Sequence, residues 1–178
     1  PLLRRAAEIA RAALDSLGEL IWATDPSYDT LDNLAAYLRQ LTLRIMGDTG
    51  LATQFEFPET VPPRRVTAQF RRELVLLVKE ALTNAARHAG ATAVTVGLKL
   101  TPKDGNGSPD RLELWVQDNG RGFDATCVPA ELSARGNAGH GLPNMRRRVT
   151  NLGGEFSIEA TPGQGTVVRA RVPLPENE

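Results

Sequence analysis

Four polar residues occur close together within residues 65–91, the segment of the chain with the most regular spacing of apolar residues. Apolar residues recur there at spacings of three and four, which predicts a helix with one continuous apolar stripe. At about 100° per residue, the flank of that stripe carries Glu80, Asn84, Arg87 and His88. A buried helix rarely needs an acid, an amide and two basic groups side by side. Taken alone, however, the segment is explained more simply by a half-exposed helix edge with a Glu80–Asn84 hydrogen bond, worth roughly a few tenths of a kcal/mol.

A second polar stretch, Asp-Asn-Gly-Arg-Gly at 118–122, lies where a predicted strand ends. Gly120 and Gly122 allow positive φ and the close approach of a planar group. At the carboxyl end of the strand, Asp118 can accept a hydrogen bond from an exocyclic amine such as that of adenine. Taken alone, Asp-Asn-Gly is more often an ordinary turn.

Two more glycine-bearing stretches follow. The first comprises Gly139, His140, Gly141 and Leu142. It stands directly before a predicted helix, where free backbone N–H groups and the helix dipole favour an anion such as phosphate. The alternative to a phosphate site is a flexible hinge with His140 as a surface histidine. The second, Gly-Gln-Gly-Thr at 163–166, is most economically a hairpin turn with Thr166 starting a strand. The four stretches occur in an order and at separations that a nucleotide site would explain.

The remaining pattern predicts α/β elements that would position these stretches. Leucines at helical spacing predict a helix over 31–45, ended by Gly47 or Gly50. A further helix is expected over 141–152. Strands are expected over 54–57, 94–100, 111–118, 155–160 and 166–174. Residues 119–140 contain few large apolar side chains, so we expect a mobile flap there.

Residues 3–20 carry an apolar seam with alternating gaps of three and four, which is typical of a helix that packs on another helix. Two interpretations stay open: a dimer or bundle helix, or a stripe that docks on this chain's own domain. Trp22 would cap the seam, and Pro26 would break the helix. The boundary between extension and domain is therefore expected near residue 28.

The composition excludes several classes of protein. The 178 residues suit one domain with an appended segment. With 21 basic and 21 acidic residues there is no bulk field to attract nucleic acid, and no nucleic-acid partner is expected. Cys127 is the only cysteine, which excludes a disulfide framework and favours a reducing, cytoplasmic setting. No apolar run reaches transmembrane length, and a start at Pro1 suggests a piece of a longer protein.

Taken in order, the four stretches resemble the motifs of the GHKL family of ATP-binding domains, and specifically the catalytic domain of sensor histidine kinases. Glu-Ala-Leu-Thr-Asn-Ala-Ala-Arg-His-Ala at 80–89 resembles the N box, 118–122 the G1 box, Gly-His-Gly-Leu-Pro-Asn-Met at 139–145 the G2 box, and 163–166 the glycine turn after it. The resemblance covers residues 65–172. Residues 19–39 are similar to the join between dimerization helix and ATPase domain in the class that includes nitrate and lipid-fluidity sensors.

The resemblance implies a two-layer α/β sandwich of the Bergerat type, with a mixed sheet covered on one face by helices and preceded by a helical extension. Residues 1–28 would be the C-terminal part of a dimerization helix with its linker. Residues 29–178 would be the catalytic domain, which binds ATP and Mg²⁺. A P-loop of the form G-x-x-x-x-G-K-[ST] is absent from the sequence, so the P-loop mode of ATP binding is excluded.

The resemblance also implies a role for each matching residue. At the phosphate end, Asn84 would bind Mg²⁺ and Glu80 would act as general base or orient the attacking group. Arg87 and His88 would contact phosphates, as would the stretch Gly139, His140, Gly141 and Leu142. At the base end, Asp118 would read adenine, Gly120 and Gly122 would form its floor, and the Thr166 hydroxyl would help to hold the ring. Residues 123–140 would be a lid over the triphosphate.

The activity implied is transfer of the γ-phosphoryl group of Mg-ATP to a histidine on a dimerization helix, for relay to a response regulator. The only histidines, His88 and His140, lie inside nucleotide motifs, so the acceptor is expected upstream, in a homodimeric and membrane-anchored parent. One alternative is a serine kinase of the anti-sigma-factor type. Another is a non-catalytic dimerization module, against which the intact Glu80, Asn84 and Asp118 argue.

Overall fold

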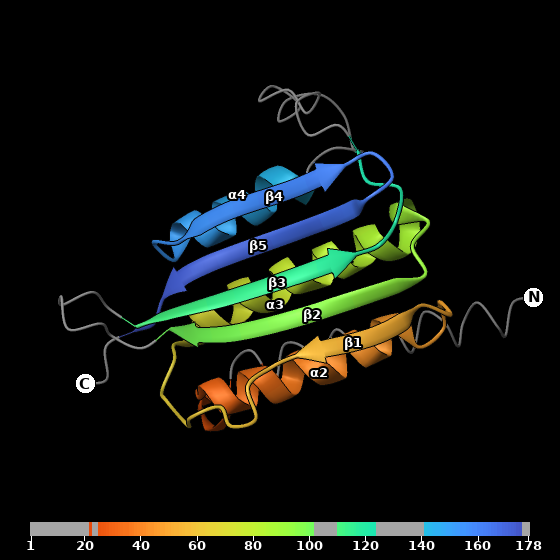
Figure 1. Ribbon diagram of the computed structural model, residues 1–178. Helices are drawn as coiled ribbons and strands as arrows, with labels where there is room; N and C mark the ends of the chain where they lie inside the picture. Colours follow the sequence, from red (N-terminus) through yellow and green to blue (C-terminus); the bar gives the residue numbers. More distant parts are fainter. Residues whose placement is uncertain (1–21, 23–24, 102–109, 124–140, 176–178) are drawn as a thin grey trace, which may run out of the picture.

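A five-stranded mixed sheet forms one layer of the protein, and helices α2 (Leu31–Met46), α3 (Ala68–Asn84) and α4 (Gly141–Asn151) cover one of its faces (Figure 1). This computed structural model describes residue 22 and residues 25–101, 110–123 and 141–175. The predicted α/β class, with a mixed sheet and helices on one face, is confirmed.

The strands follow the order β1-β2-β3-β5-β4 across the sheet. At one edge, β1 (Ala52–Glu56) pairs in parallel with β2 (Ala93–Thr101). The other pairs are antiparallel: β2 with β3 (Arg111–Asp118), β3 with β5 (Gly165–Pro173), and β5 with the second edge strand, β4 (Glu155–Thr161). Both predicted hairpins and the predicted edge strand are confirmed, although β1 begins two residues earlier than expected.

Helix α3 has the predicted apolar stripe and a clear start. The Thr67 hydroxyl accepts a hydrogen bond from the Phe70 backbone N–H at 3.1 Å, which caps the first turn. The stripe buries Leu74, Leu77, Val78, Ala81 and Leu82. The α-helical part ends at Asn84, and a π-helical segment, η2 (Ala85–Ala89), continues to Gly90, where φ is 59°. The predicted helix is confirmed, but its last turn is wider than an α-helix.

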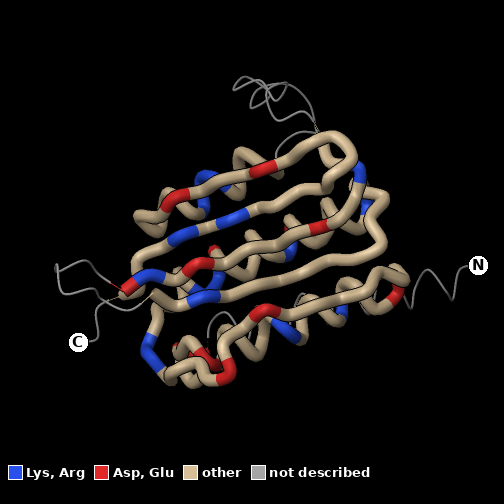
Figure 2. The backbone as a smooth tube through the Cα atoms, in the orientation of Figure 1, with Lys and Arg blue, Asp and Glu red and all other residues tan. Residues whose placement is uncertain are grey.

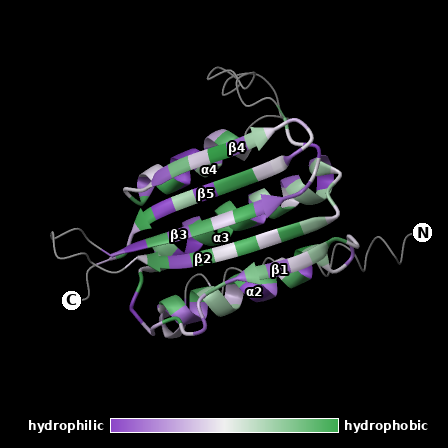
Figure 3. Ribbon diagram, viewed as in Figure 1, coloured by the Kyte–Doolittle hydropathy of each residue, from purple (hydrophilic) through white to green (hydrophobic). Residues whose placement is uncertain are grey.

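The hydrophobic core lies between the helices and the sheet. Apolar and polar residues alternate along the strands (Figure 3), so that one face of the sheet is apolar and meets the helices. The core is formed by α2, α3 and α4 against the sheet, and its fully buried members include Leu34, Leu38, Leu41, Leu74, Leu77, Leu82, Val94, Val96, Leu112, Leu114 and Met145. Among the described residues, no helix is long and apolar enough to span a membrane.

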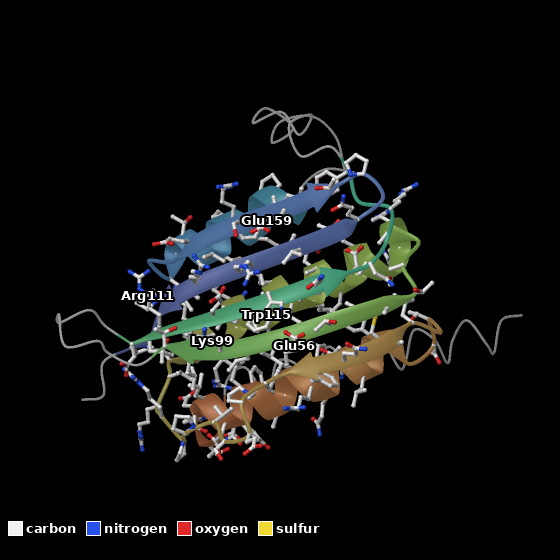
Figure 4. All side chains as sticks on the ribbon, in the orientation of Figure 1. Glu56, Lys99, Arg111, Trp115 and Glu159 are labelled. Atoms are coloured by element: carbon white, nitrogen blue, oxygen red, sulfur yellow. The ribbon has the colours of Figure 1, made fainter. Side chains whose placement is uncertain are left out.

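The opposite face of the sheet carries Trp115 and charges of both signs (Figures 2 and 4). Trp115 stands opposite Gly97, and a Cβ on Gly97 would lie 1.9 Å from the indole ring. Nearby, the Glu113 carboxylate accepts hydrogen bonds from Arg169 at 2.6 Å and Arg171 at 3.3 Å. Burial acts to raise the pKa of Glu113, but the hydrogen bond from Arg169 and the charges of both arginines outweigh it, so the pKa is lowered.

A buried arginine fixes the segment before α2 to the domain. Arg71 of α3 is 0% exposed and donates to the Trp22 carbonyl at 2.6 Å and to Asp29 Oδ1 at 2.5 Å. Its guanidinium lies 4.6 Å from the Trp22 ring centroid, and that ring stacks on Tyr37 at 3.9 Å. Trp22 therefore packs on the domain itself. Residues 3–20 lie outside the described residues, so both interpretations of their seam stay predictions.

Replacing Arg71 with methionine should destabilise the domain by about 2 to 4 kcal/mol, because the Asp29 carboxylate and the Trp22 carbonyl lose their buried partner. Chemical denaturation measures the loss, with Arg72→Met as a matched control because Arg72 is exposed. In a Trp115→Phe background, Trp22 is the one remaining tryptophan, and its emission should shift to the red. Unchanged stability and emission would show that Arg71 does not hold this segment.

Glu113 should make stability depend on pH. Because its pKa is lowered in the folded state, its contribution is present above the unfolded-state pKa and is lost as pH falls through the folded value. We expect Glu113→Gln to destabilise the protein at neutral pH, and the difference from wild type to shrink between about pH 6 and pH 3. Glu155→Gln is the control, since Glu155 is 69% exposed and pairs with Arg111 at 3.3 Å. A difference that does not change with pH would contradict the assignment.

Candidate functional site

Glu80 and Asn84 lie one turn apart at the end of α3, beside the first residue of α4. A Cβ on Gly141 would lie 2.3 Å from Oε1 of Glu80 and 3.6 Å from Nδ2 of Asn84. Only glycine permits this approach without displacing the acid. Both side chains are half-buried, and neither has a hydrogen-bond partner among the described residues. The Glu80–Asn84 hydrogen bond considered from the sequence is therefore not formed.

Arg87 and His88 occupy the last turn of η2, and both are exposed. Because a π-helical turn does not follow 100° per residue, the sequence-based projection that put them on the flank of α3 does not apply beyond Asn84. Short π-helical segments occur frequently at functional sites. Here the segment ends the helix that carries Glu80 and Asn84 and leaves two basic side chains accessible to a ligand.

Asp118 is the last residue of β3 and is only 7% exposed. Its Oδ1 accepts a hydrogen bond from the Gly120 backbone N–H at 2.9 Å, and Oδ2 has no partner among the described residues. In the register of β3 and β5, Asp118 stands opposite the half-buried Thr166. The structure thus brings the second and fourth stretches together at one end of the sheet.

Gly120 and Gly122 are both required by close backbone contacts. A Cβ on Gly120 would lie 2.4 Å from the Ala89 carbonyl oxygen, and one on Gly122 would lie 2.1 Å from that of Thr161. Gly122 has φ of 58°, as expected from the sequence. Gly120 does not adopt a positive φ; it has to be a glycine because the loop passes directly against the end of η2.

The loop of residues 119–122 also joins the other parts of the site through backbone hydrogen bonds. Arg121 N donates to the Ala89 carbonyl at 2.8 Å, and Gly163 N donates to the Arg121 carbonyl at 2.7 Å. Gly165, with φ of 84°, lets the β4–β5 turn lie against Asp118, whose carbonyl oxygen would be 2.0 Å from an added Cβ. The loop is therefore held between the helix end and the hairpin turn.

Asn119 is a residue of this loop that the sequence analysis did not single out. Its Oδ1 accepts hydrogen bonds from the backbone N–H groups of Thr92 and Ala93, each at 2.9 Å. Its Nδ2 donates to the Thr92 hydroxyl, also at 2.9 Å. The sequence indicated only a turn at Asp-Asn-Gly, and nothing local to that tripeptide could have revealed partners at the start of β2.

The three consecutive arginines of α4 have partners within the protein. Arg148 pairs with Glu73 of α3 at 2.8 Å, Arg147 donates to Asn144 at 3.1 Å, and Arg146 lies 5.3 Å from the Phe156 ring centroid. Arg148 and Arg146 thus connect α4 to α3 and β4, whereas the Arg147 hydrogen bond lies within α4. Leu142, half-buried, packs against the core in the first turn of the same helix.

The described parts of all four stretches converge at one end of the two layers. The contacts above connect the Glu80–Asn84 pair to Gly141, η2 to Gly120, and Asp118 to Gly165 and Thr166. Gly139, His140 and most of the expected lid, residues 124–140, lie outside the described residues. Of the stretch expected to bind phosphate, the structure therefore places Gly141 and Leu142.

This donor set fits a magnesium nucleotide. Mg²⁺ prefers hard oxygen ligands and often keeps phosphate oxygens and waters in its shell, so a single amide oxygen from Asn84 is a suitable protein ligand. No group of three or more His, Cys, Asp or Glu side chains that could hold a metal by itself occurs in the part of the chain described. Oδ2 of Asp118, which has no partner among the described residues, suits an amine donor, and the start of α4 suits an anion.

Comparisons with known proteins agree with this arrangement. Residues 70–176 match the family described as Histidine kinase-, DNA gyrase B-, and HSP90-like ATPase. The sensor histidine kinase LnrJ of Bacillus subtilis (strain 168) is 32% identical over 170 residues, covering 93% of this chain and 36% of LnrJ. The sensor protein VraS of Staphylococcus aureus (strain COL) is 38% identical over 101 residues, covering 57% of this chain and 25% of VraS. The chain thus spans well under half the length of these relatives.

Solved structures give the same result. The histidine kinase domain of a blue-light activated histidine kinase from Erythrobacter litoralis superposes with a TM-score of 0.58 at 28% identity, covering 79% of this chain and 61% of that one. The catalytic domain of histidine kinase ThkA superposes with a TM-score of 0.59 over 82% of this chain and 92% of that one, and at 17% identity it supports the fold alone. The chain belongs to the family of histidine kinase-, DNA gyrase B- and HSP90-like ATPases, as the ATPase domain of a sensor histidine kinase.

Proposed function

We propose that this domain binds Mg-ATP and transfers its γ-phosphoryl group to a histidine on a dimerization helix of the parent protein. The observation that carries the proposal is the contact of Gly141 with Glu80 and Asn84, which sets an acid, a metal-type ligand and a helix N-terminus side by side. Phosphoryl transfer depends mainly on such positioning and on charge neutralisation. Mg²⁺ held by Asn84 would supply part of this charge neutralisation.

Each residue has a separate task in this proposal. Asn84 holds the metal through its amide oxygen, and the half-buried Glu80 accepts a proton from the acceptor imidazole or orients it. Arg87 and His88 are exposed at the end of η2 and bind phosphate oxygens. At the other end of the nucleotide, Asp118 accepts a hydrogen bond from the adenine amine, and the half-buried Thr166 across from it helps to hold the ring.

The names of the relatives favour histidine over serine as the phosphoryl acceptor, since LnrJ is a sensor histidine kinase. We place the acceptor upstream in the parent, because His88 and His140 both fall in the nucleotide motifs. The proposal also divides the chain: residues 1–28 form the end of the dimerization helix with its linker, and residues 29–178 form the catalytic domain. The parent protein would be a membrane-anchored homodimer, and a response regulator would be the next phosphoryl acceptor.

Isothermal titration of the chain with ADP and with a non-hydrolysable ATP analogue, with and without magnesium, tests the nucleotide assignment. We expect binding that magnesium strengthens, no self-labelling from γ-labelled ATP, and labelling of an added acceptor-helix fragment of the parent. A protein that binds no nucleotide would be a non-catalytic module. Labelling of serine in a separate partner, with none on the acceptor helix, would favour the anti-sigma type of kinase.

Asn84→Ala should remove the magnesium-dependent part of nucleotide affinity, a loss of about tenfold or more, because the metal loses its protein ligand. Affinity measured in EDTA should stay close to that of wild type. Asn151→Ala is the matched control, since Asn151 is exposed at the far end of α4. If magnesium strengthens binding equally in the Asn84 variant and in wild type, another group holds the metal.

Asp118→Asn should separate base recognition from loop structure. An asparagine carbonyl at this position retains the hydrogen bond from Gly120, but its NH₂ group faces the adenine amine with a second donor. We expect ADP affinity to fall by about 1 to 3 kcal/mol, while inosine diphosphate, which presents a carbonyl acceptor instead of the amine, gains relative to ADP. Titrations with both nucleotides measure the ratio. An unchanged preference for ADP would mean that Asp118 does not read the base.

A further inference from the structure

Asn119 lies between the two ends of the proposed nucleotide site. The residue before it, Asp118, belongs to the base end, and the backbone after it contacts Ala89, which ends the segment carrying Arg87 and His88. Gly120 passes so close to Ala89 that an added Cβ would lie 2.4 Å from its carbonyl oxygen. The relative position of β3 and the end of α3 is therefore set within these few residues.

The Asn119 side chain forms the polar part of this junction. Its three hydrogen bonds, to Thr92 N, Ala93 N and Thr92 Oγ1, are each 2.9 Å long. Its backbone N–H also donates to the Ala93 carbonyl at 3.3 Å. Thr92 follows η2 closely and is itself fixed, because its carbonyl accepts from Ala52 N of β1 at 2.9 Å. The Asn119 side-chain amide thus connects the end of β3 to Thr92 and Ala93, which follow the helix that carries the proposed phosphate-binding residues.

From these contacts we infer that Asn119 is a positioning residue that sets the separation between the base-binding end of β3 and the phosphate-binding end of α3. The inference rests on the proposed nucleotide function. Asn119 is exposed, so water competes for its hydrogen bonds and each contributes modestly. Its effect on binding arises because one ligand of limited length has to contact both ends at once. A change in the separation of the two ends then weakens the contacts that the ligand makes at one of them.

A ligand that touches one end should not depend on that separation, and a ligand that spans both should. We therefore expect Asn119→Ala to weaken ADP binding by about five- to thirtyfold, and binding of adenosine, which lacks phosphates, by less than about twofold. Asn119→Asp should restore ADP affinity to within about threefold of wild type, because a carboxylate can accept from both backbone N–H groups and from the Thr92 hydroxyl.

Asn33→Ala is the matched control. Asn33 makes comparable side-chain hydrogen bonds, to Thr30 Oγ1 at 2.8 Å and the Ser27 carbonyl at 3.3 Å, at the start of α2. That variant should lose stability similarly without weakening ADP, and all titrations are made well below each variant's unfolding temperature. A purely structural role would lower the unfolding temperature of Asn119→Ala and leave its ADP affinity unchanged, which would overturn the inference.

Two other outcomes are informative. Equal weakening of ADP and adenosine would place Asn119 within the base end alone and would also overturn the inference. Wild-type protein that binds neither ligand would refute the proposed function instead, so the two failures are distinguishable. Thr92→Val, which removes one of the three hydrogen bonds, should weaken ADP binding by about two- to fivefold and add little in the Asn119→Ala background.

Discussion

The loop of residues 119–122 has to pass between the end of η2 and the β4–β5 turn, and the separation there leaves no room for side chains at its glycines. Gly120 faces Ala89, and Gly122 faces the Thr161 carbonyl. A methyl group at either position would push the helix end or the hairpin turn away from the loop. The rest of the site depends on these contacts, because Asp118 and Asn84 are carried by the two elements that the loop brings together.

Patterns local in the sequence predicted the elements well. The stripe of α3 and the alternation in β3 follow directly from periods of 3.6 and 2, and the bounds of β3 were predicted without error. The site was predictable as four stretches that belong together, but not for the right reason at every residue. The sequence showed that both glycines allow a positive φ, but only Gly122 adopts one. The constraint on Gly120 comes from Ala89, which lies far away in the sequence and cannot be inferred from a turn pattern.

Residues whose importance depends on distant partners were missed altogether. Arg71 occurs in the sequence as one more arginine beside the apolar stripe, yet it is fully buried because Trp22 and Asp29, 49 and 42 residues away, supply its acceptors. Asn119 likewise finds its partners 26 and 27 residues away. Both residues join α3 or β3 to a segment outside the motifs, and a motif gives no information about such a contact.

Basic and acidic side chains lie at different ends of the site, and this separation limits the orientation in which a charged ligand can bind. Of the arginines of α4, Arg148 pairs with Glu73 of α3, Arg147 donates to Asn144 of the same helix, and Arg146 lies over the Phe156 ring. Two exposed basic side chains, Arg87 and His88, lie at the end of η2, while the carboxylate of Asp118 lies at the end of β3. A ligand with an anionic end and a hydrogen-bond donor at the other matches this polarity. The reverse orientation would place phosphate oxygens beside a buried carboxylate, where like charges repel strongly because water is excluded.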